Sequence, residues 1–141
     1  MRWRDQAFAE LTVDELYAII ALRERVFVVE QACVYLDADG RDQASRHLWL
    51  EDGAILAYAR VVPAGLKLAQ VSIGRVIIAP EARGRGLARE LMQRALDTVR
   101  GQAVALSAQA HLEQFYASLG FARTSEIYDE DGIPHVDMVR A

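Results

Sequence analysis

The spacing of hydrophobic residues divides the chain into segments of helical and of strand character. Between Thr12 and about Arg25, apolar residues recur at helical spacing, which predicts an amphipathic helix. Thr12 and Glu15 have the spacing of a capping box, in which each side chain bonds a backbone N–H that the first helical turn leaves free. The helix is therefore predicted to begin at Thr12.

The next apolar segments favour strands. His47 to Glu51 and Ile55 to Val62 flank Asp52-Gly53, a dipeptide typical of tight hairpins. The segment from about Leu68 to Ile78 is rich in β-branched residues, and Pro80 after it cannot donate a hydrogen bond to a sheet. These patterns predict a hairpin followed by a third strand.

The second half of the chain alternates helices and strands. Apolar residues at helical spacing begin at Leu87, and Gly101 ends that pattern. The remaining elements are predicted as a short strand at Ala103–Ser107, a short helix at His111–Leu119, and strands at Phe121–Tyr128 and near Val136–Val139. This order predicts an α/β fold with one sheet in a single domain spanning residues 1–141.

Composition limits the class of protein. With 141 residues, 52% of them hydrophobic, the chain suits one globular domain, and its net charge of −4 makes nucleic acid or an anionic membrane a poor partner. The only cysteine, Cys33, excludes an intramolecular disulfide and is interpreted as a half-buried structural thiol. No apolar run approaches the roughly 18 residues that cross a bilayer. A cytoplasmic location is expected.

The loop Arg83-Gly84-Arg85-Gly86-Leu87-Ala88 carries the clearest candidate chemistry. It lies between a predicted strand and a predicted helix, where free backbone N–H groups and the helix dipole favour phosphate. Its glycines let the backbone approach a ligand, and its two arginines add positive charge. The loop is therefore predicted to bind a pyrophosphate.

Two common phosphate motifs do not fit this loop. A Walker A motif needs Gly-Lys-Ser/Thr at its end, which the chain lacks. The dinucleotide fingerprint needs a third glycine, but Arg89 stands at that position. It also needs an acidic residue about twenty positions later, where this chain has Ala105 and Leu106.

The chain resembles the GCN5-related N-acetyltransferase (GNAT) family. Arg83, Gly86 and Ala88 match its acetyl-CoA signature, and Phe115–Phe121 is similar to its late helix and glycine turn. Val26–Gln31 and Tyr128–His135 resemble the ElaA-like branch. The resemblance implies a mixed, mostly antiparallel sheet of about six to seven strands with flanking helices, splayed between two central parallel strands.

The resemblance also implies roles for individual residues. The backbone of Val76, Ile77 and Ile78 would pair with the pantetheine arm of acetyl-CoA, and an N–H near Ile78 would polarise the thioester carbonyl. The whole loop from Arg83 to Ala88 would bind the cofactor, with the N–H groups from Arg85 onward on the pyrophosphate. Tyr116 would donate a proton to the departing thiolate.

The amine acceptor needs a base, because an alkylamine is mostly protonated at neutral pH. Glu30 is the first candidate and His47 the second. His135 is a candidate for the wall of the acceptor pocket. The histidines do not have metal-ligand spacing, so no metal is expected. Asp37, Asp39 and Asp42 fail the EF-hand pattern and are interpreted as a solvated acidic loop that favours cationic amines.

Together with these patterns, the resemblance implies a cytoplasmic enzyme that moves an acetyl group from acetyl-CoA directly to a primary amine. The acceptor would be a small molecule or a peptide amine, and relatives in the family often form homodimers. Two alternatives stay open: a non-catalytic acyl-CoA sensor, and a module that binds another nucleotide through the same loop.

Overall fold

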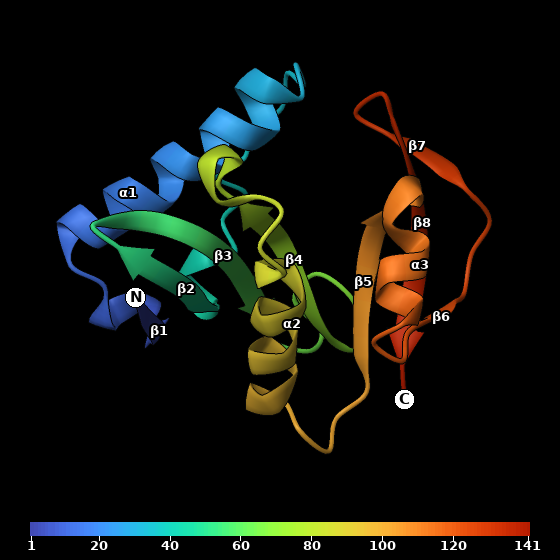
Figure 1. Ribbon diagram of the computed structural model, residues 1–141. Helices are drawn as coiled ribbons and strands as arrows, with labels where there is room; N and C mark the ends of the chain where they lie inside the picture. The colour runs from blue at the N-terminus through green and yellow to red at the C-terminus, as the bar shows by residue number, and fades with distance from the viewer.

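An eight-stranded mixed sheet forms the centre of the computed structural model, which describes residues 1–141 (Figure 1). The strand order is β1-β2-β3-β4-β5-β8-β6, and the short β7 pairs with β8. The strands are β1 (Arg2–Ala7), β2 (Arg46–Asp52), β3 (Ala54–Val62), β4 (Val71–Ile78), β5 (Val104–Gln109), β6 (Ala122–Arg123), β7 (Tyr128–Glu130) and β8 (Ile133–Arg140). The predicted fold is confirmed, with one strand more than the expected upper number.

Three α-helices accompany the sheet: α1 (Val13–Arg23), α2 (Leu87–Thr98) and α3 (Glu113–Ala117). Helix α1 continues as a π-helical segment, η2 (Glu24–Glu30). Four short 3₁₀ turns complete the chain: η1 (Phe8–Glu10), η3 (Asp42–Ala44), η4 (Pro80–Ala82) and η5 (Ala110–Leu112). No helix is long and apolar enough to cross a membrane.

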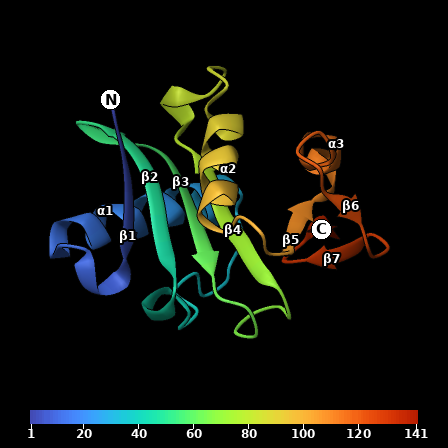
Figure 2. The same ribbon diagram turned by 90° about the horizontal axis from the view of Figure 1, so that it is seen from below.

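Helices α1 and α2 cover opposite faces of the first half of the sheet. In β1, the Trp3 side chain contacts Glu90 of α2, whereas the neighbouring Arg4 pairs with Glu15 of α1. Successive side chains of a strand point to opposite faces, so these two contacts place the helices on different sides. The view from below shows the same arrangement (Figure 2).

The two central parallel strands separate soon after they meet. β4 and β5 pair only at Val71 with Val104 and at Ser72 with Ala105, and then diverge (Figure 1). The register of β4 against β3 also shifts between Tyr58 and Arg60, which marks a β-bulge. Beyond the first two pairs, the β4 edge that faces β5 therefore lacks a strand partner.

Local patterns located several elements correctly. Glu15 N–H donates to Thr12 Oγ1 at 3.0 Å and Thr12 N–H donates to Glu15 Oε1 at 2.9 Å, so the predicted capping box is confirmed. The predicted hairpin is formed by β2 and β3.

The strand predicted at Phe121–Tyr128 is wrong, because only its ends pair with β8. Between them, the Ser125 hydroxyl accepts from Asp137 N–H in place of a backbone carbonyl.

Candidate functional site

A cavity of about 920 Å³ occupies the space where β4 and β5 diverge. Its walls come from η2, β4, β5, α3, the loops around residues 31–41 and 67–68, and the β7–β8 turn. Residues Val76 to Ile78 of β4, Arg83 and Ala88 of the glycine loop, and Tyr116 of α3 all border it. The structure therefore brings representatives of every predicted part of the site to one cavity.

The glycine loop turns the chain sharply from β4 into α2. Gly84 and Gly86 have φ angles of 82° and 73°, in the left-handed region that favours glycine, and Gly86 is the N-cap residue of α2. No side chain caps this helix, so its first N–H groups stay free for a ligand. A Cβ built at either glycine meets no atom within 4 Å, so the space above the loop is open.

Arg83 connects the glycine loop to η2 and to the end of β4. Its guanidinium donates to both carboxylate oxygens of Glu30, at 2.8 and 2.6 Å, and its Nε donates to the carbonyl of Ile78 at 3.3 Å. The hydrogen bonds and charge of Arg83 lower the pKa of Glu30. Glu30 is therefore an ionised, ion-paired carboxylate at the rim of the cavity.

Tyr116 is a buried side chain on α3, with 6% of its surface exposed. Its ring packs edge-on against Phe115 and Phe121, with centroids 5.1 and 6.1 Å away. Burial raises the pKa of Tyr116 to about 12. Its hydroxyl therefore keeps its proton throughout the neutral range and can act as a donor toward the cavity.

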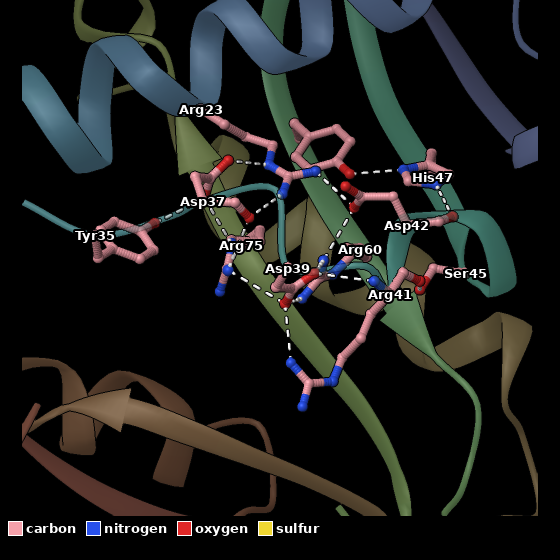
Figure 3. A network of polar contacts seen from close by, with 11 residues as sticks. Arg23, Tyr35, Asp37, Asp39, Arg41, Asp42, Ser45, His47, Arg60 and Arg75 are labelled. Carbon is pink, nitrogen blue, oxygen red and sulfur yellow. Dashed lines mark hydrogen bonds and ion pairs between the residues drawn. The ribbon is translucent and has the colours of Figure 1, made fainter. Parts of the chain in front are cut away.

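A buried arginine–aspartate network holds the loop before β2 against the sheet (Figure 3). Asp42 accepts hydrogen bonds from Arg23 at 2.7 Å and from Arg60 at 2.9 Å. Asp37 accepts from Arg23 at 2.7 Å, and Asp39 accepts two bonds of 2.8 Å from Arg60. The network consists of these five residues and Arg75.

Arg75 links this network to the β4 bulge. Its φ of 50° is a left-handed conformation that is uncommon for a residue with a side chain. The guanidinium pairs with Asp37 at 2.8 Å and with Asp39 at 3.3 Å, and it lies 5.6 Å from the ring centre of Tyr35. These contacts hold the bulge in place where β4 borders the cavity.

The prediction of a solvated acidic loop is wrong. Asp37 and Asp42 are only 5% and 6% exposed, and their charges are neutralised by arginines from α1, β3 and β4. Sequence reasoning missed these partners because they are distant in the chain. Arg60 and Arg75, each inside an otherwise apolar strand segment, were the available signal.

Other candidate residues have different surroundings. His47 does not border the cavity: it is fully buried, and its ring nitrogens bond the Tyr58 hydroxyl at 2.7 Å and the Asp42 carbonyl at 2.9 Å. Desolvation lowers its pKa. Its assignment as an alternative base is wrong, because the ring is buried away from the cavity and both of its nitrogens are already bonded. Cys33 and His135 both border the cavity, and Cys33 is buried rather than half-buried.

We expect Asp42→Ala to lower the free energy of unfolding by about 3–5 kcal/mol, because it leaves buried guanidinium charges without their carboxylate. Asp97→Ala is the control: it removes an exposed partner of Arg100, so the cost should stay within about 0.5 kcal/mol. Urea unfolding of both variants measures this difference. Equal losses would contradict a special role for the network.

The network also predicts how stability depends on pH. Burial acts to raise the pKa of Asp42, but hydrogen bonds and charges from Arg23 and Arg60 outweigh it and lower that pKa. The stabilisation is therefore complete above the unfolded value of about 3.9 and is lost as the pH falls through the lower folded value. In Asp42→Ala this part of the acid dependence should be absent from a series of urea titrations.

Comparison with known proteins agrees with this geometry. A family model described as an acetyltransferase (GNAT) domain matches residues 14–141. Protein ElaA of Escherichia coli (strain K12) is 44% identical over 148 aligned residues, which cover 99% of this chain and 96% of that protein. The chain therefore belongs to the GNAT acetyltransferase family, and its resemblance to ElaA is confirmed.

Two solved structures are similar over the whole chain. An acyl-CoA N-acyltransferase from Pseudomonas aeruginosa is 44% identical, covers 100% of both chains and gives a TM-score of 0.94. Crystalline E. coli ElaA is 42% identical, covers 99% of each chain and gives a TM-score of 0.93. The protein is thus an acyltransferase of the GNAT type, with acetyl-CoA as its co-substrate.

Proposed function

We propose that this GNAT-family enzyme transfers the acetyl group of acetyl-CoA directly to a primary amine of a small molecule or a peptide. The observation that carries the proposal is the cavity between β4 and β5, which borders the glycine loop, the free edge of β4 and Tyr116. A thioester donor and an amine can meet there without a covalent acyl-enzyme, because the acetyl group is already activated. Cys33 then needs no nucleophilic role.

The residues of the cavity fit acetyl-CoA. The open loop from Arg83 to Ala88 would bind the pyrophosphate through free N–H groups and positive charge. Val76, Ile77 and Ile78 would pair with the pantetheine arm in the manner of an added strand. A backbone N–H near Ile78 would stabilise the oxyanion of the tetrahedral intermediate.

Gly86→Ala tests the role of the loop. Alanine is strained at a φ of 73°, and its Cβ would enter the open space above the loop. We expect a loss of about 1 kcal/mol in unfolding free energy from strain. We also expect the KM for acetyl-CoA to rise by about tenfold or more.

Gly101→Ala is a matched control, because Gly101 has a similar φ of 85° and open surroundings, but follows the C-terminal end of α2 instead of capping its N-terminal end. It should lose comparable stability and keep the KM of the parent enzyme. If both variants bind acetyl-CoA as the parent does, the loop does not hold the cofactor.

In the reaction, the amine nitrogen attacks the thioester carbonyl, and the C–S bond breaks as the intermediate collapses. The departing sulfur then takes a proton, which we assign to the Tyr116 hydroxyl. Its raised pKa keeps it protonated at assay pH.

Tyr116→Phe removes only this hydroxyl and should lower kcat by roughly 100-fold. The KM for acetyl-CoA should change by less than about twofold, because the ring packing is kept. Tyr128→Phe is the control: its hydroxyl also has a raised pKa and donates to Asp137, yet the residue does not border the cavity. Steady-state kinetics that show equal kcat for Tyr116→Phe and the parent would remove Tyr116 as the acid.

The base that deprotonates the acceptor is predicted to be Glu30, but its ion pair with Arg83 supports a different role. The pairing lowers the pKa of Glu30 and occupies both of its oxygens, which weakens it as a base. We propose that Glu30 instead orients Arg83 beside the cofactor, and that solvent accepts the acceptor's proton.

We therefore expect Glu30→Gln to leave the pH dependence of kcat unchanged and to raise the KM for acetyl-CoA severalfold. Because the Glu30 carboxylate is already ionised well below neutral pH, it adds no ionisation near neutrality. A pH–rate profile that loses its acidic limb in Glu30→Gln would instead make Glu30 the base.

The central experiment is thiol release from acetyl-CoA with a panel of primary amines, with the acetylated product identified by mass spectrometry. Amine-dependent release supports the enzyme. A protein that CoA stabilises in a thermal melt, but that no amine turns over, would be an acyl-CoA sensor. Stabilisation by ATP or NAD in place of CoA would indicate a nucleotide-binding module.

A further inference from the structure

Basic side chains gather at the end of the cavity farther from the glycine loop. Four basic residues border this end: Arg41 of the loop before β2, Arg60 of β3, Lys67 of the β3–β4 loop and Arg75 at the β4 bulge. Arg60 pairs in register with Gly74, next to Arg75, whereas the glycine loop follows the opposite end of β4. The cavity thus has one end beside the glycine loop, where acetyl-CoA is proposed to bind, and a separate basic end.

The arginines at the basic end exceed the carboxylates that neutralise them. Arg41, outside the network, pairs with Asp39 at 3.3 Å. Four arginines (Arg23, Arg41, Arg60 and Arg75) therefore share only three aspartates (Asp37, Asp39 and Asp42). The Nε atoms of Arg41 and Arg60 are buried without a hydrogen-bond partner. Buried donors of this kind normally have an acceptor, which here is missing from the protein itself.

Lys67 adds a further positive charge. It is the only lysine of the chain, and it makes no ion pair with any carboxylate. Desolvation at the cavity wall, together with the charges of Arg75 and Arg60, lowers its pKa, although much of the side chain is exposed. An anion at this position would relieve that repulsion.

Acidic groups also face the cavity. Glu30 pairs with Arg83, and Asp39 belongs to the network. Glu130 lies 3.4 Å from His135, which neutralises it only when protonated, and its charge acts to raise the pKa of Lys67. Asp131, on the β7–β8 turn, has no ion-pair partner. These two carboxylates belong to the β7–β8 side of the cavity, whereas the guanidinium donors left without a partner belong to Arg41 and Arg60.

From this arrangement we propose that the acceptor is an amine that carries a carboxylate, and that Lys67, Arg41 and Arg75 hold this carboxylate at the basic end of the cavity. The inference rests on the proposed function, since it names the class of acceptor. A strand advances about 3.3 Å per residue, so Arg75 lies within about 10 Å of the Val76–Ile78 segment. That span suits a small amino acid, whose free amine and carboxylate are close together.

The reaction of such an acceptor is balanced without a further reactant. A C–N bond forms between its amine and the acetyl carbon, the C–S bond of acetyl-CoA breaks, and CoA thiol leaves with one proton. The second proton of the ammonium form goes to solvent. The carboxylate takes no part in the chemistry and only positions the amine.

The test compares acceptors that differ only in the carboxylate: α- and ω-amino acids, their amides, and alkylamines of equal length. Thiol release should show kcat/KM at least about tenfold higher for an amino acid than for its amide. Lys67→Glu should abolish most of this preference, with the KM for acetyl-CoA unchanged, and Lys67→Arg should keep it. Arg100→Glu, distant from the cavity and equal in charge change, should have no effect.

The outcomes separate the two proposals. If amides and alkylamines react as well as amino acids, and Lys67→Glu alters neither, the carboxylate site is wrong and the N-acetyltransferase proposal stands. If polyamines are the preferred acceptors, this end of the cavity does not act as a positively charged site, and the inference is overturned. If no amine of either class promotes thiol release, both proposals fail together.

Discussion

Arg23 and Arg60 have no exposed surface, and the need to neutralise them constrains the structure around the cavity. A buried guanidinium is costly unless carboxylates and hydrogen bonds surround it. Asp37, Asp39 and Asp42 meet this need, so the loop that carries them is fixed against β3 and β4 (Figure 3). The same carboxylates bind Arg75 and thereby fix the bulge. One set of ion pairs thus determines the wall of the cavity beside the β4 bulge.

The splay of β4 from β5 would be unstable without support, because it leaves strand edges unpaired. On one side, the hairpin and β4 are covered by α1 and α2, and on the other, β5 is paired along its length with β8. The two halves meet through the pairs at Val71 and Ser72. Each half therefore has its own ladder, and the gap between them can remain open for a ligand that supplies the missing partner.

The sequence predicted what local chemistry determines. The capping box at Thr12, the Asp52-Gly53 hairpin and the loop at Gly86 depend on residues close in the chain, and the structure has all three. β1 was missed because its residues, Arg2–Ala7, are mostly polar and pair at the sheet edge. The network was missed because its ion pairs join residues far apart in the chain. Whether the Glu30 carboxylate is free or ion-paired likewise depended on Arg83, 53 positions later.

The distribution of charge matters more for this cavity than the net charge of the protein. The chain carries a net charge of −4, which alone would favour cationic ligands. Its acidic side chains, however, are largely exposed or paired, whereas the basic end of the cavity combines buried guanidinium groups with an unpaired ammonium. Fields are strongest where the dielectric is low, so the buried guanidinium groups act more strongly on a bound molecule than exposed charges do. An aspartate-rich loop can therefore form one wall of a site lined by guanidinium groups, because its aspartates are already bound to arginines.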